Sequence, residues 1–185
     1  MATPRTRTAK LMGTSILAAL VLVFDYALKY SGLKIPFPWY PNLKFDFTGV
    51  PIVLSLLMYG MDSSVITSLV AGLGIWVRSG NLLSAAMKTI AELSTVAGLY
   101  LGLRVTAGRK LDAKWMALSS AVGLASRMVV MTFTNLYVLP NFYGVPMEAT
   151  IGLLPLIAAF NAAQGAITVW LGFFLDRAVK SRLAG

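Results

Sequence analysis

The stretch NLKFDFTGVPIVLSLLMYG, residues 42–60, changes from polar to strongly apolar within a few residues. Lys44 and Asp46 stand before the apolar part, and Pro51 stands near its start. The apolar part is shorter than the roughly 20 residues that a helix needs to cross a bilayer. We interpret the stretch as the junction between an outer loop and a short second membrane helix. Asp46 is expected to cap that helix, and Leu43 and Lys44 are expected at the mouth of a cavity.

The whole chain is far more apolar than a soluble protein. Of its 185 residues, 57% are hydrophobic and 12% are charged, and the mean hydropathy is +0.74. A soluble domain of this size carries about 25% charged residues. The composition therefore indicates a helical integral membrane protein in a lipid bilayer.

Apolar runs bounded by polar residues predict the helices. We predict an all-α bundle of six transmembrane helices in a single membrane domain, residues 1–185. Residues 28–46 form a long outer loop after helix one, and residues 1–10 and 176–185 form cytoplasmic tails. The N-terminal segment is read as a retained tail because no cleavage site of small residues follows the first run. The runs cover residues 11–27, 47–59, 65–77, 82–103, 115–139 and 151–175.

The basic residues predict the orientation of the bundle. With the N-terminus inside, ten Lys and Arg residues lie on the cytoplasmic side and five on the outer side, which places both termini in the cytoplasm. The same placement accounts for the net charge of +9 without a nucleic-acid partner. The inner residues are Arg5, Arg7, Lys10, Arg104, Arg109, Lys110, Lys114, Arg177, Lys180 and Arg182, and the outer ones are Lys29, Lys34, Lys44, Arg78 and Lys88.

Enzyme chemistry finds little support in the sequence. The chain has no Cys and no His, so it lacks thiolates and the commonest general base and metal ligand. No catalytic motif occurs, and we predict neither catalytic residues nor a metal site. A small membrane enzyme would have to use Glu92, Asp46 or Asp25 as its base. A purely structural assembly subunit is a further alternative.

Three charged residues interrupt the apolar runs. Lys88 and Glu92 are four residues apart and so share one helix face, and Arg127 interrupts the fifth run. Charges inside a membrane are costly and are functional candidates by default. Glu92 and Arg127 either form a structural ion pair or line a polar ligand cavity, and Lys88 either joins them or reaches the membrane surface.

Amide side chains form a second polar set. Asn161 and Gln164 are three residues apart on one face of the sixth run, and Asn135 lies with Thr134 near the outer end of the fifth. An amide both donates and accepts hydrogen bonds, which suits a neutral heterocycle with ring N–H and C=O groups. The alternative is that these amides join helices to one another.

Small residues recur at fourfold spacing, which lets helices approach closely. Ser15 and Ala19 form such a pair in the first run, and Gly98 with Gly102 and Ser119 with Gly123 form others. Most are expected to pack inside the bundle. A pair on an outer face is a candidate docking site for a partner protein.

Three segments resemble those of a known family. LKFDFTGVPIVLSLLMYG resembles the Lys-x-Asp-Phe-Ser-x-x-Pro segment of the S components of energy-coupling factor (ECF) transporters. NLYVLPNFYG, residues 135–144, and LPLIAAFNAAQGAI, residues 154–167, resemble segments of the riboflavin-binding members. The length, six helices and long outer loop agree with this family over nearly the whole chain.

The resemblance implies a membrane-embedded, high-affinity vitamin-binding subunit of an importer in the cell membrane. Its partners would be a transmembrane coupling protein and two cytoplasmic ATPase subunits. Riboflavin is the expected ligand, as transported solute rather than cofactor, and another vitamin or precursor such as pantothenate is the alternative. In the family, an Ala-x-x-x-Ala pattern on helix one contacts the coupling protein, and here Ser15 and Ala19 match that spacing.

The resemblance also implies a ligand site closed by the outer loop as a lid. Asn161 matches the family's helix-six Asn, whereas Gln164 replaces a charged residue and Asn135 lies one position after the family's Asn, where this chain has Thr134. Trp39 and Tyr40 in the lid either stack on a flat ring or belong to an interfacial aromatic belt.

Overall fold

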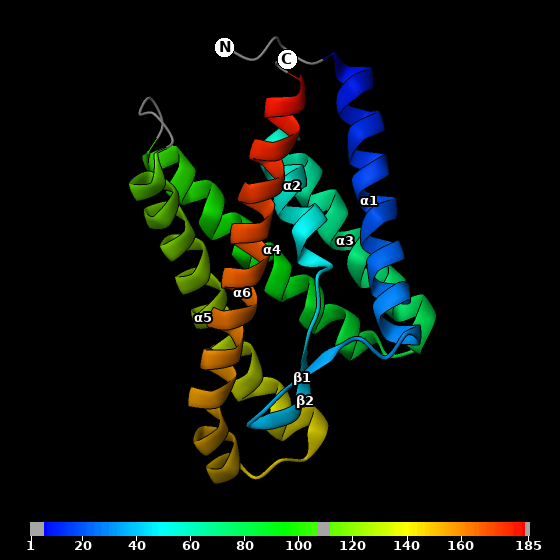
Figure 1. The fold of residues 1–185 in the computed structure, drawn as a ribbon. Helices are drawn as coiled ribbons and strands as arrows, with labels where there is room; N and C mark the ends of the chain where they lie inside the picture. Colours follow the sequence, from blue (N-terminus) through cyan, green and yellow to red (C-terminus); the bar gives the residue numbers. More distant parts are fainter. Residues whose placement is uncertain (1–5, 107–111, 184–185) are drawn as a thin grey trace. The chain divides into compact units, whose positions relative to one another are not determined.

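The computed structural model describes residues 6–106 and 112–183 (Figure 1). These residues form six α-helices and one two-stranded sheet. The helices are α1 (Arg7–Tyr30), α2 (Gly49–Tyr59), α3 (Met61–Ser79), α4 (Leu82–Val105), α5 (Ala113–Tyr143) and α6 (Met147–Leu183), and the strands are β1 (Ile35–Phe37) and β2 (Tyr40–Phe45). The predicted helical architecture is therefore confirmed for the described residues, with the sheet as an addition.

Four of the helices, α1, α4, α5 and α6, are long and apolar enough to cross a membrane. α2 is apolar but has only 11 residues, which is about 16 Å of helix and about half of the hydrocarbon thickness. α6 runs eight residues beyond the predicted apolar run because its last two turns are polar but still helical. Helical geometry thus extends past the segment that hydropathy alone marks.

Contacts group the chain into two compact units. The first contains the described residues of Met1–Leu33, Phe47–Thr89 and Thr168–Gly185, and the second those of Lys34–Asp46 and Ile90–Ile167. The boundaries fall inside α4 and α6 and at the two ends of the sheet segment.

The first unit packs α1, α2 and α3 against one another. Val21, Ile52 and Val53 are fully buried in it, and Gly172 of α6 meets the side chain of Val53. A single residue, Gly60, joins α2 to α3 with a φ of +93°, a conformation that side chains with a Cβ rarely adopt. The two helices can therefore pack directly on each other.

The second unit depends on a close crossing of α4 and α5. A Cβ at Gly98 would lie 2.8 Å from the Val122 carbonyl oxygen, and one at Gly102 would lie 2.7 Å from Cα of Ser119. Backbone meets backbone at this crossing because both residues lack side chains. The prediction that the α4 and α5 small residues pack inside the bundle is confirmed.

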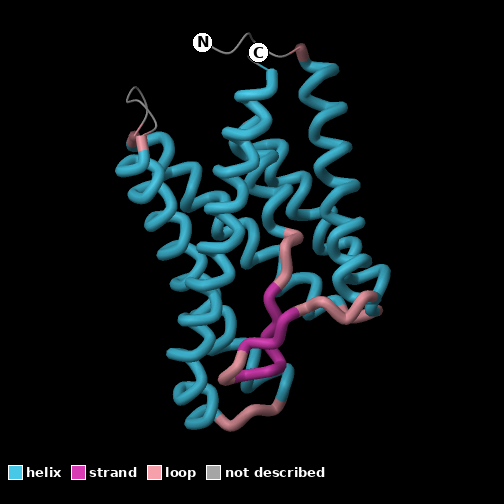
Figure 2. Tube along the Cα trace, in the orientation of Figure 1, coloured by secondary structure: helices cyan, strands magenta, loops and turns pink. Residues whose placement is uncertain are grey.

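The segment after α1 is a β-hairpin rather than an irregular loop (Figure 2). Ile35 pairs with Phe45 and Pro36 with Lys44, and the register shifts before Phe37 pairs with Tyr40. Pro38 begins the turn, where its fixed φ is favourable. The prolines and aromatics of the segment therefore build an ordered hairpin, which the expectation of an all-α fold did not include.

The start of α2 corrects the predicted role of Asp46. α2 begins at Gly49 with Thr48 at the N-cap, and the Thr48 side chain makes no capping hydrogen bond. Asp46 lies two residues too early to serve as the cap. Pro51 falls within the first turn, where its missing N–H removes no helical hydrogen bond.

Candidate functional site

A buried polar cluster centred on Arg127 joins three helices of the second unit. Arg127 Nη1 lies 3.2 Å from Glu92 Oε1 and 3.0 Å from Thr95 Oγ1, both on α4. Its Nε donates to Asn161 Oδ1 on α6 at 3.1 Å. The side chain of Arg127 is 3% exposed and that of Glu92 is 0% exposed. One of the two alternatives from the sequence, the Glu92–Arg127 ion pair, is thus present, and Arg127 also donates hydrogen bonds to Thr95 and Asn161.

Hydrogen bonds to neutral groups and close packing also position the Arg127 guanidinium, in addition to its ion pair with Glu92. Nη1 also approaches the Ala91 carbonyl at 3.5 Å, so three of its contacts come from one turn of α4. Gly165 leaves room for the Arg127 stem, since a Cβ there would lie 3.3 Å from Arg127 Cδ. Among the described residues, none accepts a hydrogen bond from Nη2, which keeps two donors for another group.

The amides of α5 and α6 are only partly used. Asn161 Nδ2 donates to the Ile157 carbonyl at 2.9 Å, and Asn135 Nδ2 donates to the Met131 carbonyl at 2.7 Å. Both side chains are buried, yet Asn135 Oδ1 accepts no hydrogen bond from the part of the chain that the structure describes. Thr134 directs its hydroxyl hydrogen to Val130 O at 2.7 Å, which leaves the oxygen as an acceptor.

Gln164 bonds to the end of the hairpin. Its Nε2 donates to the Asp46 carbonyl at 2.7 Å, and its Oε1 accepts from the Asp46 N–H at 3.3 Å. One turn earlier on α6, the Phe160 ring lies 5.6 Å from Phe37 and 5.1 Å from Phe45, centroid to centroid. The hairpin is therefore fastened to α6 through one amide pair and one aromatic cluster.

The other predicted hairpin residues are more open. Trp39 is 70% exposed and meets Phe37 edge to face at 5.1 Å. Tyr40 and Leu43 are half-buried. The hairpin thus offers a partly free aromatic surface next to the Phe37–Phe45–Phe160 cluster, which sequence reasoning missed although Phe160 directly precedes Asn161.

Lys88 belongs to the first unit and is half-buried. The same unit holds a second buried ion pair, in which Arg78 Nε lies 2.8 Å from Asp25 Oδ2. From the sequence, Asp25 is a candidate only as the base of a membrane enzyme. Its pairing with Arg78 explains how an apolar helix can carry a buried carboxylate.

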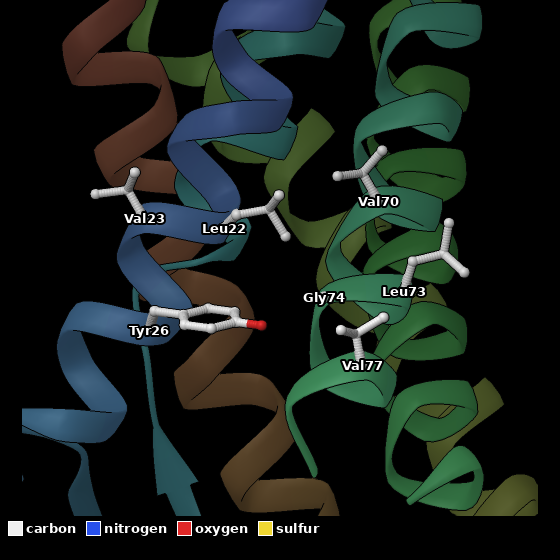
Figure 3. Close-up of a pocket in the computed structure, with 7 residues that line it drawn as sticks. All are labelled: Leu22, Val23, Tyr26, Val70, Leu73, Gly74 and Val77. Atoms are coloured by element: carbon white, nitrogen blue, oxygen red, sulfur yellow. The ribbon is translucent and has the colours of Figure 1, made fainter. Parts of the chain in front are cut away.

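A groove of about 430 Å³ lies between α1 and α3 in the first unit (Figure 3). Its surface is apolar apart from the hydroxyl of Tyr26, so it does not match a ligand with several polar edges. It is lined by Leu22, Val23, Tyr26, Val70, Leu73, Gly74 and Val77. We therefore place the candidate site in the second unit. Within residues 6–106 and 112–183, no group of three or more His, Cys, Asp or Glu side chains could hold a metal ion.

Comparison with solved structures identifies the architecture. No family model matches the chain. A structure described as the S component of a bacterial ECF transporter aligns with a TM-score of 0.78 over 96% of this chain and 99% of that one, at 22% identity. The chain has the S-component fold.

A curated relative extends the likeness to sequence. The chain is 27% identical over 136 residues to the riboflavin transporter FmnP of Bacillus subtilis (strain 168), which covers 72% of this chain and 67% of that protein. Both matched proteins are transport proteins rather than enzymes. This S-component-like chain is a multi-pass protein of the plasma membrane, in agreement with its apolar helices.

Proposed function

We propose that the chain is the vitamin-binding subunit of an ECF-type importer and that its ligand is riboflavin. One observation carries the proposal. Within a single compact unit, the aromatic hairpin is bonded to the α6 turn that also presents Asn161 to the Arg127 cluster. A flat ring with polar edges needs this combination of aromatic surface and buried hydrogen-bonding groups.

The chemistry of the cluster suits the uracil-like edge of a flavin, which alternates C=O and N–H groups. Asn135 Oδ1, on a side chain that is largely buried, is an acceptor for a ring N–H. Arg127 Nη2 and the second Nδ2 hydrogen of Asn161 are donors for ring carbonyls. Trp39 and Tyr40 supply stacking surface. The proposed site also includes Thr134, Leu43 and Glu92, and Gln164 holds the hairpin beside it. The riboflavin transporter among the relatives supports the choice of ligand.

The test is ligand retention and affinity. We expect the purified protein to be yellow and to release riboflavin on denaturation, as identified by mass spectrometry. Asn135→Leu should weaken riboflavin binding by about 1–3 kcal/mol, because it removes the buried acceptor for a ligand N–H. Asn141→Leu on the exposed end of the same helix is the matched control and should bind as the parent does. Equal affinity of the Asn135 and Asn141 variants would remove Asn135 from the site.

We further propose that all six helices lie in the membrane, with both termini in the cytoplasm and the hairpin outside as a lid. In the first unit, the start of α1 and the end of α6 lie at the same end, shown in blue and red in Figure 1. Arg7, Lys10, Lys180 and Arg182 are at these two helix ends. The positive-inside rule supports a cytoplasmic location for them.

The proposed partners are the transmembrane coupling protein and two ATPases of the importer, with Ser15 and Ala19 as the docking pair. Both residues are exposed on α1, so they present a small-residue stripe that another helix can approach closely.

Ala19→Trp should abolish co-purification with the coupling protein while riboflavin binding persists, because a large ring on the stripe keeps a partner helix at a distance. Val129→Trp, at an exposed position on α5, is the control and should assemble normally. Assembly of the Ala19 variant at the parent level would refute the docking role.

A further inference from the structure

The Gln164 side chain pairs with Asp46 in the way that a residue of a neighbouring β-strand would, through one donated and one accepted hydrogen bond. The Gln164 amide donates through Nε2 and accepts through Oε1, and both bonds go to the two main-chain groups of one residue. Two adjacent strands satisfy each other in the same way. A carboxylate cannot donate and an ammonium cannot accept, so among side chains of this length the amide is the one that makes both bonds.

Asp46 stands at a structural boundary. It is the last residue of the hairpin segment of the second unit, Lys34–Asp46, and Phe47 begins the next segment of the first unit. The Gln164 amide therefore holds the hairpin at the point where the chain leaves it. The aromatic cluster around Phe160 holds the two strands themselves, one helical turn away on α6.

The ligand-facing residue lies between these two attachments. Asn161 is in the same α6 turn, after Phe160 and three residues before Gln164, and it bonds to Arg127. A hairpin fixed at Phe160 and at Gln164 consequently stays next to Asn161. Both bonds of Gln164 would have to break for the base of the hairpin to leave this position.

We propose that Gln164 is the latch of the lid: it keeps the hairpin closed and thereby sets how slowly the ligand leaves. Gln164 is a positioning residue in this role, acting through Asp46 rather than through contact with the ring. The inference rests on the proposed riboflavin-binding function for the ligand's exit, while the latch itself is a property of the protein without ligand.

The first measurement needs no ligand. In amide hydrogen exchange of the purified protein, both Gln164→Met and Gln164→Glu should raise exchange in residues 34–46 roughly tenfold. Met loses both hydrogen bonds to Asp46, whereas Glu loses the donated bond and places a carboxylate against the Asp46 carbonyl oxygen. Exchange in α5 should stay at the parent level. Asn141→Asp makes the same amide-to-carboxylate change at an exposed site and should leave the hairpin protected.

The second measurement uses riboflavin. By stopped-flow fluorescence, both Gln164 variants should release riboflavin roughly tenfold faster, with association rates within about twofold of the parent. A general loss of structure would not confine the effect to dissociation. Parent-like hairpin exchange in both variants, or faster exchange with unchanged release, would overturn the latch. If the parent binds no riboflavin, the proposed ligand fails, whereas the exchange measurement still decides whether Gln164 holds the hairpin.

Discussion

Replacement of Arg127 by Met is expected to lower the free energy of unfolding by about 3–5 kcal/mol, the cost of removing one member of a buried ion pair. Arg127 supplies the positive charge bonded to Glu92 and donates to Thr95 and Asn161. Met has a similar stem, so the loss is mainly of charge and hydrogen bonds rather than of volume. Thermal or denaturant unfolding of the purified protein measures the effect.

Two further variants separate charge from packing. Glu92→Leu combined with Arg127→Met removes both charges and should recover a large part of the loss, since replacing a whole buried pair by apolar groups is often neutral. Arg104→Met, at an exposed site on α4 where the guanidinium lies over the Tyr100 ring, should change stability by less than about 1 kcal/mol. An Arg127→Met protein as stable as the Arg104 control would contradict the structural role of the pair.

Adding a single methyl group at the α4–α5 crossing is expected to have the second largest effect. In Gly98→Ala, the new Cβ would lie 2.8 Å from the Val122 carbonyl oxygen and 3.0 Å from Cα of Gly123. These neighbours are backbone atoms that cannot rotate away, so the two helices must move apart. Overpacking of this kind costs about 1–3 kcal/mol, and Gly102→Ala should behave alike because it meets Cα of Ser119.

The control for this prediction is Gly152→Ala on α6. A Cβ at Gly152 meets nothing within 4 Å, so this variant should be neutral or slightly stabilised through its higher helix propensity. Unfolding temperatures of the three variants, measured side by side, test the crossing. Equal unfolding temperatures for the Gly98, Gly102 and Gly152 variants would contradict the close packing of α4 on α5.

The features that sequence predicted share a physical origin. The sequence marks Glu92 and Arg127 either as an ion pair or as the lining of a ligand cavity, because charges in apolar runs are costly. The glycines of α4 were expected to face another helix because their spacing repeats on one side. In both cases the membrane leaves few structural alternatives for such residues, so residue type and spacing along the chain are enough to predict how they pack.

The remaining features depend on contacts between distant segments. Gln164 and Asp46 are 118 residues apart, and no local pattern indicates that a side-chain amide will bond to a main chain so far away. The hairpin contains three prolines, and proline makes a strand less probable in any prediction from sequence. The strands are instead stabilised by the Phe160 ring, which packs on Phe37 and Phe45. Asp46 was assigned as a cap because the helix start was expected two residues too early.

The role of Asp46 in the structure also changes the interpretation of residues 42–60. Asp46 is not the N-cap residue of α2, whereas its main-chain N–H and C=O groups are hydrogen-bonded to the Gln164 amide. The polar start of residues 42–60 thus marks the base of the hairpin and the boundary between the two units. This placement connects the proposed lid to the helix that carries Asn161.

Titration of the purified, ligand-stripped protein with riboflavin decides whether the chain is a riboflavin-binding subunit. We expect saturable quenching of flavin fluorescence at one riboflavin per chain, with sub-micromolar affinity and no competition by pantothenate. An absence of saturable riboflavin binding by protein that is folded and monodisperse would contradict it, as would displacement of riboflavin by pantothenate at equal concentration.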